Sequence, residues 1–268
     1  MTSPDSEKVR GPTNLFMRSY QCQSLYFRSM TDSASALTEH NELARIYEVL
    51  ELYSEMVKEV KAVVQLRDAA KEQLSMDERN RLSVAYKHNT GRLRTAWRAT
   101  PEILSNARNF TIAGLVRRVR TQLKDEILSH CQEVIQLLEK QTVTRDEDGV
   151  FLLKMRGDYH RYQAEVDGEK MEHQMQAAKA YTEASKLAKD VLTPANSVRL
   201  GLSLNHSVFL FEIVGDRTAA CLLAREALEQ ALRALDDADV ECQSEVTVIL
   251  QLLRDNLTIW TAEDSTNE

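Results

Sequence analysis

Hydrophobic residues recur at steps of three and four along most of the chain, which is the spacing of one face of an α-helix. The longest stripe crosses about seven turns and comprises Ile112, Leu115, Val116, Val119, Leu123, Ile127, Cys131, Val134 and Leu138. The same spacing predicts one or two helices over residues 37–74 and another that begins at residue 75. Further helical segments are predicted over residues 150–166, 173–192, 197–214, 217–235 and 242–262.

Residues that start and stop helices divide these stripes. Ser75 and Glu78 have the spacing of a capping box, so we expect a helix to begin there. Thr100-Pro101 should end that helix, and the polar run that finishes at Gly149 should end the long one. Residues 166–172 are predicted to form a loop.

The fold class follows from how rarely the pattern is interrupted. With 8 Gly and 4 Pro in 268 residues, the chain has few positions where a helix must stop. No Asn-Gly or Asp-Gly pair separates two alternating runs, so the sequence gives no sign of β-hairpins. We predict an all-α fold in which successive helices, joined by short loops, pack antiparallel.

The two ends differ in composition from the rest of the chain. Residues 1–36 are rich in Ser and Thr with isolated aromatics, and we expect an N-terminal extension that is disordered or forms one added helix. Residues 37–262 are predicted to form one continuous helical domain, followed by a short acidic tail at 263–268.

Charge, apolar run length and cysteine spacing exclude several classes of protein. The net charge of −7 disfavours nonspecific nucleic-acid binding and leaves only a local basic groove possible. No apolar run approaches the roughly 18 residues of a membrane-spanning helix. The four cysteines lie far apart and form no metal-ligand spacing, which suits a reduced compartment. We therefore expect no nucleic-acid or membrane partner and a cytoplasmic location, with the nucleus compatible with the same features.

Catalytic signatures are absent from the sequence. The histidines never fall into an HExxH pattern, and no GxSxG, GxGxxG or GKS/GKT loop occurs. His160 lies beside Asp158 and Arg161, but a lone histidine on a charged helix is more often solvated than catalytic. We predict no enzymatic activity, no bound metal and no cofactor.

Two lines of charge and two asparagines are the candidate functional features. Lys87, Arg94 and Arg98 share one helix face opposite a set of apolar residues, and Lys154, Asp158 and Arg161 form a second charged line. Two asparagines sit within apolar stripes, Asn205 near Leu204, Val208 and Glu212, and Asn256 near Leu252 and Trp260. Such side chains either tie helices together or bind an extended peptide backbone, and the spacing leaves both readings open.

Several stretches resemble the 14-3-3 family of phosphoserine- and phosphothreonine-binding adaptors. The most specific are RNRLSVAYK with TAWR, KMRGDYHRY, RLGLSLNHSVFLFEI and LLRDNLTIW, and the resemblance runs from about Leu43 to Ala262. It implies an antiparallel domain of about nine helices with a concave amphipathic groove, usually paired into a dimer.

The resemblance also implies roles for individual residues. The phosphate pocket of the family matches Lys87, Arg94, Arg98, Arg161 and Tyr162. Residues expected to bind the ligand peptide are Lys154, Leu204, Asn205, Val208, Glu212, Ile249, Leu252, Asn256 and Trp260. Asp158 is expected to orient the cations. Phosphorylated client proteins are therefore the implied partners.

The chain departs from the family pattern where family members form dimers. The expected interface residues are Ile46, Tyr47, Leu50, Val119, Gln122 and Glu126. Several are apolar where relatives carry charged or polar groups, so we expect a more hydrophobic homodimer or a heterodimer with a paralogue. The alternative is a monomer in which the N-terminal extension covers that surface. Ala96 replaces a serine whose phosphorylation splits the dimer in many relatives, so that switch should be missing.

The sequence thus predicts a non-enzymatic adaptor that binds phosphorylated peptides. The alternative is an all-α scaffold that binds acidic or helical ligands in the same groove without phosphate dependence. Arg28–Thr31 and Thr266–Glu268 resemble ligand motifs of the family, although Ser and Thr near Arg are common by chance.

Overall fold

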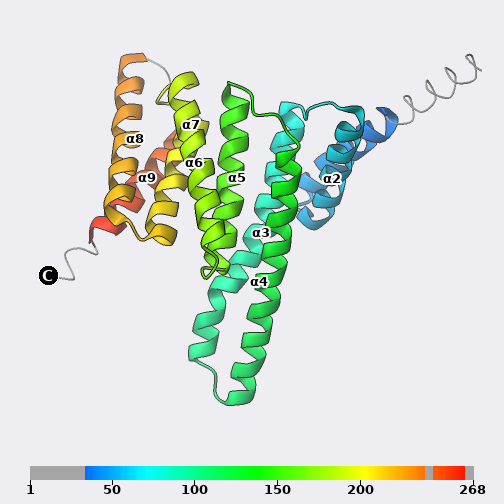
Figure 1. Cartoon of the computed structure of the whole chain (residues 1–268), viewed down its shortest axis with the longest axis vertical. Coiled ribbons are helices and arrows are strands. Elements are labelled where there is room, and N and C mark those ends of the chain that lie inside the picture. The colour runs from blue at the N-terminus through cyan, green and yellow to red at the C-terminus, as the bar shows by residue number, and fades with distance from the viewer. Residues whose placement is uncertain (1–33, 239–243, 263–268) are drawn as a thin grey trace, which may run out of the picture. The chain divides into compact units, whose positions relative to one another are not determined.

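The computed structural model describes residues 34–238 and 244–262 and is helical almost throughout these ranges, with no β-strand among them. A helix over residues 34–49 precedes the labelled helices (Figure 1). These are α2 Tyr53–Ala70, α3 Met76–Ser105, α4 Phe110–Glu139, α5 Glu147–Val166, α6 Met171–Val191, α7 Ser197–Phe209, α8 Arg217–Ala238 and α9 Ser244–Ala262. The predicted all-α fold is confirmed.

The chain forms two compact units, divided between Glu72 and Gln73. The described part of the first unit holds the helix over residues 34–49 and α2, joined through Glu51 in the left-handed conformation at φ 55°. His40 Nδ1 lies 2.6 Å from the Glu59 carboxylate and ties the two helices together.

The second unit contains α3 to α9. The helices α3 and α4 pack side by side, α5 packs against α4 and α6, and α7 lies among α5, α6, α8 and α9. One apolar cluster, around the buried Tyr181 and Phe209, fills the space between α5, α6 and α7. A second cluster, around Leu200 and Leu253, joins α7 to α8 and α9. The clusters hold α5 and α7 in place relative to each other, while α3 packs on α4 and α4 packs on α5. The helices α3, α5 and α7 carry most of the candidate site.

The predicted start of α3 is confirmed and its predicted end is wrong. Ser75 Oγ accepts from the Glu78 backbone N–H at 3.3 Å, and the Glu78 carboxylate accepts from the Ser75 N–H at 2.8 Å, which completes the capping box. The helix then continues through Pro101 to Ser105. Proline lacks the N–H that would bond the carbonyl of Trp97. That carbonyl instead accepts from the Thr100 hydroxyl at 2.7 Å and from Arg120 Nη1 at 2.9 Å, so the helix loses little.

The polar run of residues 142–149 follows the end of α4 at Glu139, as predicted, but its last three residues belong to α5, which begins at Glu147. Asp146 caps this helix by accepting from the Gly149 N–H at 3.1 Å. A Cβ at position 149 would collide with the carbonyl of Thr144, so this close approach requires glycine. The predicted loop after α5 is confirmed at residues 167–170 and is shorter than expected, since α6 starts at Met171.

The segment predicted as a helix over residues 197–214 has a break in its geometry. It is α-helical to Phe209 and then forms a π-helical turn, Leu210–Val214, that ends at Gly215 with φ 77°. Such turns occur often at functional sites.

The structure does not describe residues 1–33 of the predicted extension, which include Cys22 and the motif Arg28–Thr31. Cys242 and the motif Thr266–Glu268 also lie outside the described residues. The predictions made for these parts of the chain stay predictions. Of the other two cysteines, Cys131 is fully buried and Cys221 is half-buried, as expected of small apolar side chains.

Candidate functional site

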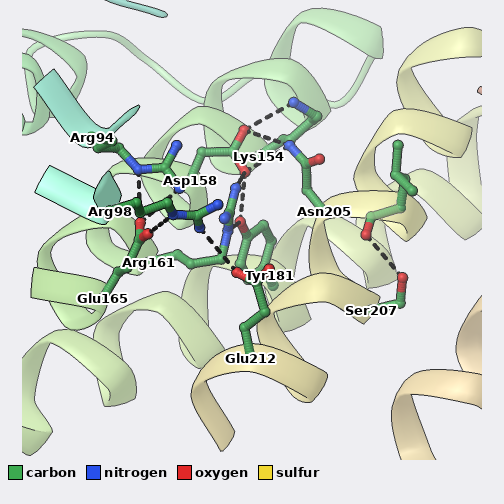
Figure 2. Close-up of polar contacts among 11 residues, drawn as sticks. Arg94, Arg98, Lys154, Asp158, Arg161, Glu165, Tyr181, Asn205, Ser207 and Glu212 are labelled. Atoms are coloured by element: carbon green, nitrogen blue, oxygen red, sulfur yellow. Dashed lines mark hydrogen bonds and ion pairs between the residues drawn. The ribbon is translucent and has the colours of Figure 1, made fainter. Parts of the chain in front are cut away.

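The helices α3 and α5 bring two arginines onto one carboxylate (Figure 2). Arg94 and Arg98, one turn apart on α3, both reach Glu165 on α5. Arg94 donates from Nε to Glu165 Oε2 at 2.7 Å, while Arg98 donates from Nε to Oε1. The Glu165 side chain is only 10% exposed, so this shared ion pair is fixed within the protein.

Arg161 is fixed separately on the buried side of α5. Its Nε donates to the Tyr181 hydroxyl at 3.0 Å, and that hydroxyl donates to Asp158 Oδ1 at 2.5 Å. Arg161 Nη2 lies 3.5 Å from the same oxygen. A guanidinium that is 7% exposed needs such partners, since an unpaired buried charge is strongly unfavourable.

Asp158 is the centre of this second set of contacts. It also accepts from Lys154 Nζ at 2.9 Å and from Asn205 Nδ2 at 2.8 and 3.0 Å. Burial alone would raise the pKa of Asp158, but Lys154, Arg161 and the Tyr181 hydroxyl outweigh burial and hold the pKa below its ordinary value. Asp158 therefore stays ionised, and the amide nitrogen of Asn205 serves as a tie between α5 and α7.

The ring of Tyr162 lies between the two sets of cations. The Arg94 guanidinium carbon is 3.7 Å from the ring centroid and that of Arg161 is 4.7 Å from it. Tyr159 meets the same ring edge-on at 5.5 Å. The aromatic face stabilises both cations and keeps their planes oriented. Arg94, Arg98, Arg161 and Tyr162, predicted as a group, are thus brought together.

A cavity of about 590 Å³ extends from Tyr162 along α7 and α9. Seven of the predicted residues line it: Lys87, Lys154, Tyr162, Leu204, Asn205, Ile249 and Leu252. Asp158 lines it as well. Residues that the sequence did not single out complete the wall: Ser83, Phe151, Met155, Tyr159, Ser197, Val198, Gly201, Glu245 and Val248. A Cβ at Gly201 would lie 3.6 Å from the Lys154 side chain, which is an ordinary contact distance.

Four predicted peptide-binding residues lie outside this lining. Val208 packs into the cluster between α7, α8 and α9, and Trp260 is 5% exposed and stacked on Phe211 at 4.8 Å. Asn256 is half-buried on α9. Glu212, on the π-helical turn, instead contacts Arg98 Nη2 at 3.3 Å and lines a second cavity, of about 290 Å³.

Two residues of the site were missed by the sequence reasoning. Glu165 follows Arg161 by four positions and therefore lies on the same face of α5, which is a spacing that could have revealed it. Tyr181 gave no such signal, because it reaches Arg161 from α6, a separate helix.

The residues predicted for a dimer interface are mostly exposed. In the first unit, Ile46 and Leu50 are 47% and 57% exposed, while Tyr47 is half-buried. In the second unit, Val119, Gln122 and Glu126 are exposed on α4. The joined ends of α3 and α4 expose further apolar side chains: Ile103, Phe110, Ile112 and Leu115. Phe110 is 94% exposed, and a hollow of about 470 Å³ at these helix ends is lined by Ile103, Ala107 and Ile112, among others.

Histidine chemistry finds no support in the geometry. His160 Nδ1 lies 3.2 Å from Gln163 Oε1, and burial lowers the pKa of this histidine. Among the described residues, no three His, Cys, Asp or Glu side chains are placed to hold a metal ion, and no helix is both long and apolar enough to cross a membrane.

Comparison with known proteins gives one family. The model of the 14-3-3 protein family matches residues 43–261. Similar curated proteins include 14-3-3 protein 6 from Solanum lycopersicum and 14-3-3-like protein 16R from Solanum tuberosum, each 38% identical over 88% of this chain and 95% of the relative. The 14-3-3 protein 3 of Entamoeba histolytica is 36% identical over 84% of this chain and 96% of its own length.

Proposed function

The chain belongs to the 14-3-3 family, and from that premise we propose that it is a non-enzymatic adaptor that binds client proteins through phosphoserine or phosphothreonine. One observation carries the proposal: Arg94 and Arg161 lie against Tyr162, Arg98 shares Glu165 with Arg94, and Tyr162 stands at one end of a groove that has an apolar wall.

The chemistry of these groups suits a phosphate. Guanidinium forks hold phosphate oxygens through charge-assisted hydrogen bonds, often two at a time. Glu165 bonds Nε and Nη2 of Arg94 and Nε of Arg98, and Tyr181 bonds Nε of Arg161, so Nη1 of Arg94 and both Nη atoms of Arg98 are not taken by these two residues. Lys87 adds a mobile point charge, and the Tyr162 hydroxyl adds a donor. Because the arginines are oriented before binding, little side-chain entropy is lost when the phosphate arrives.

The rest of the groove suits an extended peptide. Leu204, Ile249 and Leu252 would contact ligand side chains, and Lys154 would contact the residue after the phosphate. The amide nitrogen of Asn205 donates to Asp158. The amide oxygen of Asn205 would then accept a hydrogen bond from a ligand backbone N–H. Val208, Glu212, Asn256 and Trp260 stay predicted contacts for a ligand longer than the cavity of about 590 Å³.

The competing function is a scaffold that binds acidic or helical ligands without phosphate dependence. The two are separated by capturing proteins from a lysate on the wild-type protein and on Arg94→Ala, with half of the lysate treated with phosphatase. The adaptor should retain phosphoproteins that the variant and the treated lysate both lose. Retention that survives the phosphatase would favour the scaffold.

We also infer that the protein pairs, as a homodimer or with a paralogue. The exposed apolar residues of α3 and α4, Phe110 among them, favour burial against a second chain. Sedimentation should show a species heavier than 30.5 kDa.

A further inference from the structure

Arg98 is held by two carboxylates that differ in how firmly they are fixed. Glu165 bonds its Nε, and the same carboxylate is anchored by Arg94 through Nε and Nη2 at 2.7 Å each. Glu212 meets Arg98 Nη2 at 3.3 Å, a longer contact. The Glu212 side chain is 41% exposed against 10% for Glu165. Exposed ion pairs contribute little and exchange readily, whereas the buried pair does not.

The two carboxylates also bond different nitrogens of the guanidinium. Glu165 bonds Nε, on the side of α5. Glu212 contacts Nη2, one of the two Nη atoms through which a phosphate in the proposed pocket would be held. A ligand phosphate that takes both Nη atoms therefore competes with Glu212 for Nη2.

The backbone and its surroundings allow Glu212 to move away. This residue lies on the π-helical turn, Leu210–Val214, which ends at Gly215 in a conformation that favours glycine. The cavity of about 290 Å³ beside it is lined by Arg98, Glu165, Glu212 and Lys170. Open space is thus available to a carboxylate that leaves Arg98, and Lys170, which pairs with Asp167 at 3.1 Å, lines the same cavity.

We propose that Glu212 is an internal latch on the phosphate site. In the empty groove Glu212 holds Arg98, and a bound phosphate takes its place while Glu165 stays on both arginines. The latch weakens every phosphorylated ligand by the cost of breaking one exposed ion pair. This proposal rests on the proposed function and assigns to Glu212 a role in the empty site.

A double-mutant cycle tests the latch with the full-length protein. Fluorescence anisotropy with one labelled phosphoserine peptide would give the dissociation constants of wild type, Glu212→Gln, Arg98→Ala and the double variant. Removing the latch should tighten binding by about 1.5- to 5-fold, the range of an exposed ion pair. In the Arg98→Ala background the same substitution should have no effect, because the latch acts through that arginine.

Glu183→Gln is the matched control, since it removes the same charge from an exposed position on α6 that does not line either cavity. It should leave the affinity unchanged. Weaker binding by Glu212→Gln, or equal tightening with and without Arg98, would overturn the latch. If the wild type did not prefer the phosphorylated peptide at all, the proposed function would fail first and the latch with it.

Discussion

The proposed phosphate site and the apolar surface of α3 and α4 differ in whether their side chains already have partners within the chain. In the site, Arg94, Arg161 and Asp158 are paired inside the protein before any ligand binds. On the apolar surface, Phe110 and Val119 are 94% and 48% exposed, and no described residue of the second unit covers them. The proposed site is therefore paired within the chain in advance, whereas the apolar surface is left for the proposed second chain to cover.

The difference has a physical origin. A buried cation without a partner is costly, so the chain must provide counter-ions for its arginines even when the groove is empty. An exposed apolar side chain costs little by itself, and its burial becomes favourable only when a partner arrives. Four predictions test this difference between the two regions.

The largest effect is expected in the phosphate site. Arg94→Ala should weaken binding of a phosphorylated peptide by about 2–5 kcal/mol, because it removes one partner of a hydrogen-bonded charge pair. Isothermal titration calorimetry measures the loss. Arg92→Ala, at an exposed position two residues earlier on α3, is the control and should bind as the wild type does. Equal losses in both variants would mean that net charge, and not the paired arrangement, governs affinity.

The stability of the site should depend on pH through His206. This ring is stacked on Tyr181 at 5.2 Å, and burial lowers its pKa from 6.5 to about 4. Between pH 6.5 and about 4, the unfolded chain binds a proton at this histidine and the folded chain does not. Stability is therefore full above pH 6.5 and falls as the pH drops toward 4. The total loss should be about 3 kcal/mol.

Urea unfolding at several pH values measures this loss. His206→Phe keeps a ring against Tyr181 and cannot titrate, so its stability should fall less over the same window. Burial also lowers the pKa of His160 and of His173, and these residues contribute in the same direction in both proteins. Parallel curves for wild type and variant would remove His206 as a source of the pH dependence.

The Tyr181 hydroxyl should contribute to both stability and binding. Tyr181→Phe leaves Arg161 and Asp158 each short of one buried hydrogen bond, at a cost of about 1–3 kcal/mol in the free energy of unfolding. Denaturant unfolding measures this cost, and weaker phosphopeptide binding should accompany it. Tyr53→Phe, in the first unit, serves as a comparison outside the phosphate site. A stable variant with unchanged affinity would show that the hydroxyl does not hold Arg161 in place.

The smallest effect on folding is expected on the apolar surface. Phe110→Ser should change the unfolding free energy by no more than about 0.5 kcal/mol, since the ring is almost fully exposed. It should nevertheless shift the protein toward the 30.5 kDa monomer in sedimentation and leave the affinity for a single phosphopeptide unchanged. A wild type that sediments only as the monomer would contradict the inferred pairing.

The sequence predicted a helix correctly where the apolar residues of one face or a single capping motif are enough to define it. The stripe in α4 and the capping box at Ser75 needed no knowledge of distant residues. The prediction failed at Pro101, because Arg120 on another helix supplies a bond to the carbonyl that proline leaves without a donor. Helix ends that depend on such tertiary contacts cannot be located from the local pattern.

The candidate site shows the same division. The cations of α3 and α5 could be named from spacing and family resemblance, and the structure places Arg94 and Arg161 against Tyr162 and joins Arg98 to Arg94 through Glu165. Their counter-ions were harder to foresee, since an acidic residue four positions from an arginine, as Glu165 is from Arg161, is common on any exposed helix. Tyr181 became part of the site only through the packing of α6 on α5.

The central claim is that the groove recognises the phosphate itself. Calorimetric titration of the wild-type protein with one peptide in phosphorylated and unphosphorylated form tests it most directly. The arrangement of Arg94, Arg98 and Arg161 predicts that phosphorylation tightens binding by at least about 2 kcal/mol, roughly thirtyfold. Equal affinity for the two forms would contradict the account.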